Sequence, residues 1–373
     1  MRRISVNSLQ PGMVVGRTIF DNDGRALLSA GITLNESQIK HLIETGFTSI
    51  YIKNDFASDI DAPPDVISDE TRIETIRLVK ESFQTLEQRR RLNISSVQAT
   101  VDKLIDELLM NRSILVNLAD IRSHDDYTFS HCVSVCVLAI MTGITMGYSE
   151  QRLKEIGIGA LLHDIGKVRI DKDILVKPGE LTDEEYNEVK CHPEYGFDIL
   201  RTYDDVPLLS AHIAFQHHER WDGKGYPRRL TAEEIHEYAR IVSVADVYDA
   251  LMADRPYRPA YSVNQAVTII SRMSGTQFDP RVLNALVANI AIFPVGSVVA
   301  LSTGEIGVVI QVHKDLPAKP VVRVVLDNNL RRMSKPHEVD LAKLKTVYIA
   351  KLLEDDEVAE LFHGFESILT LES

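Results

Sequence analysis

Histidine and aspartate side chains of the kind that bind divalent metal ions recur within little more than a hundred residues of this chain. Each lies in a short, distinctive motif, and together they supply five imidazoles and two carboxylates: His131, the pair His163-Asp164, His192, the pair His217-His218, and Asp246. Neutral imidazole and ionised carboxylate suit divalent iron, manganese, nickel or zinc, and a carboxylate can bridge two ions. The set therefore predicts a two-metal hydrolytic centre.

The adjacent pair His163-Asp164 is expected near the end of an apolar helix. Consecutive side chains on a helix point about 100° apart, so both reach one cluster only if it lies beside that helical edge. A bridging Asp164 would hold two ions about 3.5–4 Å apart with a shared water, whose pKa falls toward neutrality. The resulting hydroxide is a nucleophile suited to in-line attack on phosphorus. Carboxylates that orient ligand histidines are also expected, and the candidates are Asp125, Asp126, Glu219 and Asp249.

Each of these residues also has a structural explanation that involves no metal. His131 on an apolar helix can be a core histidine with satisfied hydrogen bonds, and His192 can be a helix-end residue. The pair His217-His218 can lie in a solvated turn. Asp246 within an apolar helix is harder to explain in this way, because an unpaired carboxylate is costly to bury. Taken together, the residues favour the metal centre.

Further motifs near the proposed ligands could bind a phosphate-containing substrate. Trp221-Asp222-Gly223-Lys224-Gly225-Tyr226-Pro227 places two glycines and a proline around an aromatic ring. It can be simply a tight turn, or a shaped loop that presents Tyr226 to a base or a ribose. Arg255 and Arg258 follow the last acidic ligand and could clamp phosphate with two hydrogen bonds each. Lys167, close behind the first ligand pair, offers a point charge to the same substrate.

The composition restricts the class of protein. The chain has 373 residues, 45% of them apolar, which leaves room for two or three globular domains. No run of apolar residues is expected to span a bilayer. The basic start Met1-Arg2-Arg3 has no apolar stretch behind it, so it does not resemble a secretory signal. We therefore expect a cytoplasmic protein.

The net charge and the cysteines exclude further classes. A formal charge of −13 argues against sequence-independent binding to duplex DNA. Two metal ions with nearby cations can still reverse the field locally and admit a small anion. Cys132, Cys136 and Cys191 form an odd-numbered set without zinc-finger spacing, which argues against a disulfide framework. We expect these cysteines to be small core residues.

The order of the elements predicts a mainly α protein, with an all-helical core between a small N-terminal α+β domain and a C-terminal β appendage. The acidic segment 54–68, which contains a Pro-Pro pair, is typical of a linker. The expected boundaries are 1–53 for the N-terminal domain, 54–68 for the linker, 69–122 for connecting helices, 123–290 for the catalytic core, 293–350 for the β appendage and 351–373 for a C-terminal helix.

Capping and turn residues locate individual elements. One helix is expected to run from Ser149 through His163-Asp164 and to stop at Gly166, and another covers 240–251 around Asp246. Capping-box patterns that announce other helices are Ser95-x-x-Gln98, Thr182-x-x-Glu185 and Thr231-x-x-Glu234. In the N-terminal domain we expect a helix at 37–44 ended by Gly46, a turn at 21–24, and strands at 13–15, 26–28 and 49–52. In the appendage we expect a hairpin of 297–301 with 306–310 and a third strand at 321–325.

At these residues the chain resembles the HD-GYP family, a subgroup of the HD metal-dependent phosphohydrolases. The resemblance covers about residues 123–290, and the segment before the linker resembles the small domain that often precedes HD-GYP domains in bacteria. The matching motifs are Tyr127-Thr128-x-x-His131, His163-Asp164-Ile165-Gly166-Lys167, Lys177-Pro178-Gly179-x-Leu181-Thr182, His192-Pro193-x-x-Gly196, His217-His218-Glu219-x-x-Asp222-Gly223-x-Gly225-Tyr226-Pro227, Asp246-x-x-Asp249-Ala250 and Arg255-Pro256-Tyr257-Arg258.

The resemblance implies hydrolysis of a cyclic dinucleotide, typically cyclic di-GMP, to linear pGpG or on to GMP. Asp164 and Lys167 are the expected catalytic residues. By position, one metal ion would be bound by His131, His163, Asp164 and Asp246, and the other by Asp164, His192, His217 and His218. Substrate binding would fall to Lys167, Tyr226, Arg255 and Arg258.

One position departs from a pattern seen in some members of the family. They carry a glutamate one helical turn before the first histidine, where it helps to bind a third metal ion. In this chain that position is Tyr127. We therefore expect a two-metal centre, occupied by iron or manganese, and cleavage that favours pGpG over complete conversion to GMP.

Two alternatives stay open. One keeps the fold but changes the substrate to 3′,3′-cyclic GMP-AMP or to a mononucleotide. The Gly225-Tyr226-Pro227 loop favours cyclic dinucleotides, yet it does not separate the two that contain guanine. The other alternative is a signalling scaffold that binds partners such as diguanylate cyclases through the same loop. Against it, every ligand of a two-metal site is present. The sequence does not decide whether the chain forms a homodimer.

Overall fold

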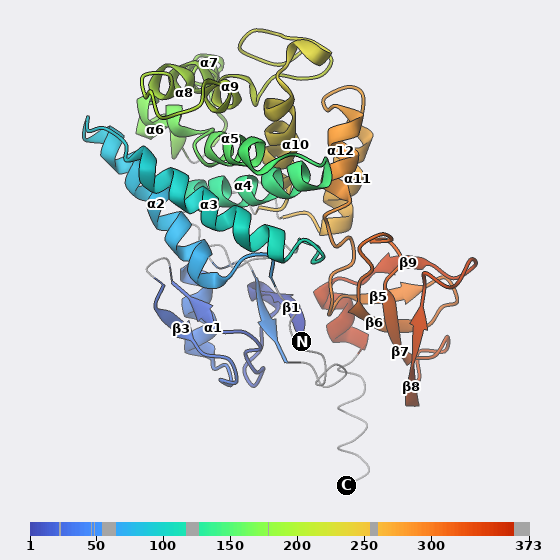
Figure 1. The fold of residues 1–373 in the computed structure, drawn as a ribbon. Helices are drawn as coiled ribbons and strands as arrows, with labels where there is room; N and C mark the ends of the chain where they lie inside the picture. The colour runs from blue at the N-terminus through green and yellow to red at the C-terminus, as the bar shows by residue number, and fades with distance from the viewer. Residues whose placement is uncertain are drawn as a thin grey trace. The chain divides into compact units, whose positions relative to one another are not determined.

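The described part of the chain forms two compact units. The computed structural model describes residues 1–21, 24–45, 47, 49–53, 65–116, 127–177, 179–253 and 260–361. The helical unit comprises Asp65–Leu118 and Asp126–Ile290, and the mixed unit comprises Met1–Pro64, Ala119–Asp125 and Ala291–Ser373. Figure 1 labels most helices and strands of both units.

The helical unit is organised around α4, which packs against α2, α5, α10 and α12. Figure 1 shows α2 and α3 as a helical hairpin, and these two helices contact α4 and α5. The elements of this unit are α2 (Asp69–Glu87), α3 (Ile94–Met110), α4 (Tyr127–Thr145), α5 (Glu150–Leu161), η4 (Ile165–Arg169), α6 (Lys172–Leu175), α7 (Asp183–Val189), α8 (His192–Leu200), α9 (Leu208–Gln216), η5 (Ala232–Glu234), α10 (Glu237–Leu251), α11 (Val263–Arg272) and α12 (Pro280–Val287). An all-helical core is thus confirmed.

The central helix α4 corrects one expectation from the sequence. Its window Thr128–Thr145 is long and apolar enough to cross a membrane, with a mean hydropathy of 1.6. However, 72% of this window is buried inside the protein, which is the pattern of a core helix. Cys132 and Cys136 are completely buried in it, whereas Cys191 is only partly buried, and all three thiols are free.

The end of the predicted linker belongs to the helical unit. Val66 and Ile67 are each only 1% exposed, and the Asp65 carboxylate accepts a hydrogen bond of 2.6 Å from Arg72 on α2. Burial of this apolar pair places the boundary before 65 rather than after 68. The remainder of the predicted linker, 54–64, lies outside the described residues.

Two of the predicted capping boxes form, and one does not. Thr182-x-x-Glu185 caps α7 as expected. Thr231-x-x-Glu234 also forms a box, but it opens only the short turn η5, and α10 begins after it. At α3 the cap is Asn93, whose side-chain oxygen accepts the N–H of Ser96. Asn93 comes first in the chain and takes the capping role, so Ser95 lies inside the helix.

The N-terminal part of the mixed unit is a small α+β fold with two antiparallel strand pairs, β1 with β4 and β2 with β3. The predicted strand at 13–15 does not form: Val14 and Val15 make only isolated bridges, to Thr33 and Ile52. The predicted Gly46 helix stop and part of the turn at 21–24 lie outside the described residues. The elements are β1 (Arg2–Ser5), η1 (Val6–Ser8), β2 (Ile19–Phe20), β3 (Ala26–Leu28), α1 (Glu36–Glu44) and β4 (Ser49–Ile52).

The C-terminal part of the mixed unit is a five-stranded antiparallel sheet with the order β8-β7-β6-β5-β9. The predicted hairpin and third strand are confirmed as β5, β6 and β7. The strands are β5 (Val298–Leu301), β6 (Ile306–Gln311), β7 (Val321–Leu326), β8 (Arg332–Asp340) and β9 (Ile349–Leu352).

The sequence does not predict either edge strand of this sheet, β8 or β9. β8 is largely exposed and contains Pro336, a residue that sheets tolerate mainly at their edges. β9 pairs with β5, so the predicted C-terminal helix does not begin at 351. Residues 355–361 are helical, and 362–373 lie outside the described residues.

The two parts of the mixed unit were expected as separate domains, yet polar contacts join them. The Asp355 carboxylate forms an ion pair with Arg2 and accepts the backbone N–H of Ser5 at 2.7 Å. The Arg2 side chain is 11% exposed, so this pair is largely shielded from water. The first strand and the last described helix are therefore held together.

Candidate metal centre

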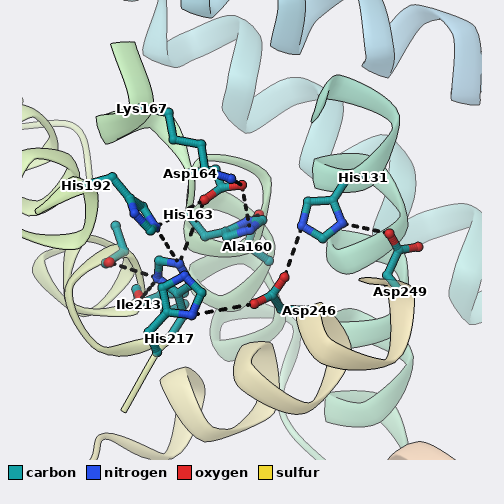
Figure 2. A network of polar contacts seen from close by, with 12 residues as sticks. His131, Ala160, His163, Asp164, Lys167, His192, Ile213, His217, Asp246 and Asp249 are labelled. Atoms are coloured by element: carbon teal, nitrogen blue, oxygen red, sulfur yellow. Dashed lines mark hydrogen bonds and ion pairs between the residues drawn. The ribbon is translucent and has the colours of Figure 1, made fainter. Parts of the chain in front are cut away.

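The structure brings all seven predicted ligands into one cluster, and Figure 2 labels each of them except His218. One Asp164 oxygen, Oδ1, lies 3.3 Å from Nε2 of His192 and 3.9 Å from Nε2 of His217. The other, Oδ2, lies 3.5 Å from Nε2 of His163. The carboxylate is 2% exposed, and its two oxygens face different histidines.

The pair His163-Asp164 lies just beyond α5 rather than within it, which corrects the predicted helix end. The last helical bond is donated by the N–H of Leu162 to the carbonyl of Ile158, and the 3-10 turn η4 follows Asp164. Because His163 and Asp164 lie outside the helix, their side chains need not point about 100° apart. Both side chains can therefore point into the same cluster.

Backbone carbonyls orient three of the imidazoles. In each case Nδ1–H donates to the carbonyl three residues earlier: His163 to Ala160 at 2.7 Å, His192 to Val189 at 2.7 Å and His217 to Ala214 at 2.9 Å. A carbonyl can only accept, so the proton of the neutral ring must be on Nδ1. The Nε2 lone pairs are consequently left to face the centre.

The Nε2 atoms show that a cation fits this site. Nε2 of His192 and Nε2 of His217 are 3.3 Å apart, and with both protons on Nδ1 no hydrogen lies between them. Nε2 of His163 is buried and has no hydrogen-bond partner in the described structure. Buried polar atoms are seldom left unpaired. Lone pairs that converge in this way are what divalent metal ions bind.

The ligands divide into two groups whose donor atoms lie within 4.8 Å of one another: His192 with His217 and His218, and His131 with His163 and Asp164. Asp246 lies between the two groups. Its Oδ1 is 3.0 Å from Nε2 of His131, and its Oδ2 is 3.9 Å from Nδ1 of His218. The arrangement is suited to two ions with Asp164 between them.

A carboxylate orients the remaining buried histidine. Asp249, one turn after Asp246 on α10, accepts a hydrogen bond of 2.7 Å from Nδ1 of His131 and is completely buried. Of the four acidic residues proposed for this role, Asp249 fills it. Asp125 and Asp126 lie outside the described residues.

Glu219, the fourth candidate, serves the neighbouring loop instead. Its buried carboxylate accepts the backbone N–H groups of Arg228 at 2.7 Å and Leu230 at 3.0 Å. These bonds fix the chain just after Gly225-Tyr226-Pro227, and the Tyr226 ring stacks on His218 with 4.8 Å between centroids. The loop is thereby attached directly to a proposed ligand.

Lys167 lies beside the centre. Its Nζ donates to Oδ2 of Asp164 at 2.5 Å. Burial tends to lower the pKa of this lysine, but the adjacent Asp164 outweighs it and raises the pKa above its ordinary value. Lys167 therefore stays charged. The remaining predicted substrate-binding residues, Arg255 and Arg258, lie outside the described residues.

Replacing Glu219 by glutamine should loosen the loop without emptying the metal centre. The amide keeps one acceptor oxygen but turns an N–H group toward a backbone N–H, so one of the two bonds is lost. Because a buried donor left unpaired costs about 1–3 kcal/mol, we expect KM to rise roughly tenfold while metal content stays unchanged. Steady-state kinetics with metal analysis would measure this. The matched control is Glu234→Gln, which alters a similar bond to the Thr231 N–H on the exposed surface and should change KM less than twofold.

Metal binding should release a proton from His131. Burial opposes its charge, but Asp246 and Asp249 raise its pKa to about 9 in the metal-free protein. Burial lowers the pKa of His192 to about 3 and that of His218 to about 4, so these rings are already neutral. Between pH 7 and 9, metal affinity should therefore rise about tenfold per pH unit, and the rise should end above pH 9. Titration calorimetry in buffers of different ionisation enthalpy would count the proton, and a proton count of zero would contradict the assignment.

Comparison with known proteins identifies the family of the chain. Residues 76–282 match the family model of the HD domain, and residues 298–361 match that of a KOW domain associated with the HD domain. The chain is 36% identical over 243 residues to a cyclic di-GMP phosphodiesterase of Pseudomonas aeruginosa, with 65% of this chain and 58% of the relative covered. It is 43% identical over 162 residues to a cyclic di-GMP phosphodiesterase of Thermotoga maritima, with coverage of 43% and 44%.

Another relative has a different substrate in its name. The chain is 30% identical over 257 residues to a 3′3′-cGAMP-specific phosphodiesterase of Vibrio cholerae, with 69% of this chain and 55% of the relative covered. The chain thus spans about half the length of the curated relatives it matches.

Proposed function

Because this chain belongs to the HD domain family, and by its motifs to the HD-GYP group within it, we propose that it is a metal-dependent phosphodiesterase that hydrolyses cyclic di-GMP to pGpG. The observation that carries the proposal is the convergence of imidazole lone pairs on both oxygens of one buried carboxylate, Asp164. The names of the relatives support the choice of substrate.

The residues of the site have distinct roles in this proposal. Two divalent ions, when bound, would lower the pKa of a water molecule and polarise a phosphoryl oxygen. Asp164 would contribute to both ions. The remaining ligands would be divided between them, with His192, His217 and His218 for one ion and His131, His163 and Asp246 for the other.

Two further residues would act on the substrate directly. The charged Nζ of Lys167, held beside Asp164, offers a hydrogen bond to a phosphate oxygen near the reacting phosphorus. The Tyr226 ring has one face against His218, so it presents a fixed surface at the edge of the site for a base or a ribose. Arg255 and Arg258 stay predicted phosphate ligands.

Finer points of the proposal rest on the sequence and the family. Imidazole and carboxylate ligands suit iron or manganese. With tyrosine at position 127 we propose a two-metal centre and pGpG as the main product. A cytoplasmic location, a homodimer and a diguanylate cyclase partner remain predictions.

Product analysis tests the substrate. The purified chain, loaded with manganese or with iron, is incubated with cyclic di-GMP and, separately, with 3′,3′-cyclic GMP-AMP. We expect metal-dependent appearance of pGpG that chelation abolishes. Faster cleavage of cyclic GMP-AMP would instead support the second candidate function, a cyclic GMP-AMP phosphodiesterase, which the similarity to the Vibrio cholerae enzyme favours. Two bound metals without cleavage of either dinucleotide would refute the proposal and leave a phosphohydrolase of another substrate or the scaffold.

A further inference from the structure

The loop that carries Tyr226 has a second set of contacts, on the side of α11 and α12. We call residues 219–231 the Tyr226 loop. The backbone N–H groups of Trp221 and Asp222 donate to carbonyls of the connection between α11 and α12, residues 273–279, at 3.0 and 2.7 Å. The loop therefore lies on this connection as well as against the metal centre.

The Tyr226 loop is closely packed on itself. The N–H of Tyr226 donates to the carbonyl of His218 at 3.2 Å. A Cβ at Gly225 would lie only 2.4 Å from the backbone nitrogen of Arg220, so the two stretches of the loop are in direct contact. Closely packed atoms transmit a displacement to their neighbours. A shift of Trp221, the residue after Arg220, is therefore expected to move Tyr226.

The side chain of Trp221 lies against a buried arginine of α10. The guanidinium carbon of Arg240 is 5.4 Å from the centre of the Trp221 ring, and the arginine side chain is 10% exposed. Tryptophan is the aromatic side chain that attracts a cation most strongly, and the attraction increases when the pair is shielded from water. This contact therefore attaches the Tyr226 loop to α10.

Neutralisation of Asp279 does not by itself explain why Arg240 is buried. Oδ2 of Asp279, on the side of α12 that packs against α10, accepts a hydrogen bond of 2.7 Å from Arg240. The same oxygen accepts a bond of 3.3 Å from Arg281, whose side chain is 68% exposed. Nε of Arg240 is buried and has no hydrogen-bond partner in the described structure. Such burial is costly, and the contact with Trp221 is what distinguishes Arg240 from Arg281.

The helix α10 links the Tyr226 loop to the metal centre. Arg240 is near the start of α10, six residues before the proposed ligand Asp246 and thus about 9 Å away along the helix axis. Most of α10 is buried, so the helix is held firmly in the core. One rigid element therefore sets both the position of a metal ligand and the position of the Tyr226 ring.

We propose that Arg240 is a positioning residue for the substrate, which holds the Tyr226 ring at the distance from the metal centre that a nucleotide base requires. The inference rests on the proposed function for the identity of the ligand. Arg240 acts through Trp221 and does not touch the reacting atoms. It therefore sets the affinity for the substrate rather than the rate of P–O bond cleavage.

Kinetics and fluorescence of Arg240→Gln test this role. We expect KM for cyclic di-GMP to rise about tenfold, as loss of a shielded cation–π contact predicts, with kcat and metal content nearly unchanged. Trp221 is the only tryptophan of the chain, so its emission reports on the loop without any substrate. Acrylamide should quench this emission more strongly in the variant. The matched control is Arg281→Gln, which removes the exposed cation from the same Asp279 oxygen and should change KM less than about twofold.

Replacing Trp221 tests the same contact without altering the buried ion pair, and it decides the question if Arg240→Gln does not fold. KM should rise from the wild type to Trp221→Phe and further to Trp221→Leu, because attraction for a cation falls in that order. The double variant with Arg240→Gln and Trp221→Leu should have the KM of the single variants, since the two residues act as one unit. Equal KM in the wild type and Trp221→Leu would overturn the proposal.

The outcomes separate this inference from the proposed function. Unchanged quenching in Arg240→Gln, equal effects of Arg240→Gln and Arg281→Gln, or a parallel loss of kcat and bound metal would overturn the positioning role and leave the enzyme. A wild-type chain that does not hydrolyse cyclic di-GMP would refute the enzyme. Stronger quenching in Arg240→Gln alone would in that case still support Arg240 as the residue that holds the loop.

Discussion

Asp164→Asn should abolish hydrolysis, with kcat lower by roughly 10³-fold or more. Metal-ion catalysis contributes several kcal/mol of transition-state stabilisation, and Asp164 is the residue whose two oxygens face both groups of histidines. Asparagine has almost the same volume, but it replaces one oxygen by an NH₂ group that repels a cation and removes the charge. Elemental analysis should find less than one metal ion per chain in the variant, beside its lost activity.

The control for Asp164→Asn is a lysine-paired aspartate away from the centre. Asp102 accepts a hydrogen bond of 2.7 Å from Lys154, much as Asp164 does from Lys167, but with half of its side chain exposed. Exposed ion pairs contribute about 0–1 kcal/mol, so Asp102→Asn should retain activity within twofold. An Asp164→Asn variant that keeps two metal ions and a tenth of the activity would contradict the bridging role.

Gly166→Ala should be the most destabilising single-methyl change at the site. A Cβ at position 166 would lie 2.0 Å from the carbonyl oxygen of His192 and 2.4 Å from the backbone nitrogen of Gly196. Backbone atoms cannot rotate away as a side chain can, so η4 and the start of α8 would have to separate. We expect the free energy of unfolding to fall by about 3 kcal/mol or more, measured by urea denaturation of the metal-free chain. Displacement of His192 should also reduce metal binding.

Gly196→Ala is the matched control, because it adds a methyl group to the other side of the same contact. There the nearest atoms are Cβ of Ala214 at 3.3 Å and the nitrogen of Gly166 at 3.4 Å, which small shifts accommodate. Alanine also favours the helix by up to about 1 kcal/mol over glycine. The net change should stay within about 1 kcal/mol. Equal losses in both variants would show that the close approach at Gly166 is not what limits the packing.

The side chains of the centre can be predicted from the sequence, whereas the groups that orient them cannot. Few side-chain types bind metals, so histidine and aspartate in unusual motifs are conspicuous. The orienting groups of His163, His192 and His217 are backbone carbonyls, which every residue possesses and which no residue type marks. Glu219 and Asp249 are both acidic and both close to ligands in sequence. Only the fold shows that Asp249 contacts a ligand ring and that Glu219 holds a loop.

The same contrast applies to the fold. Helix periodicity and alternating strands reveal the helical core and the strands β5 to β7, because burial imposes those patterns. The edge strand β8 has one side in water and few apolar residues, so alternation is weak there. The end of α5 depends on a single hydrogen bond, from Leu162 to Ile158, and cannot be located to one residue from apolar pattern alone.

The carbonyl contacts of the histidines also bear on how this centre tolerates change over evolution. An imidazole held by its own backbone keeps its orientation when neighbouring side chains are replaced, since no substitution deletes a carbonyl. His163, His192 and His217 are protected in this way. His131 is not, because it is held by the side chain of Asp249. A substitution at position 249 is therefore the change that most easily alters the orientation of a ligand, and with it properties such as the preference among metal ions.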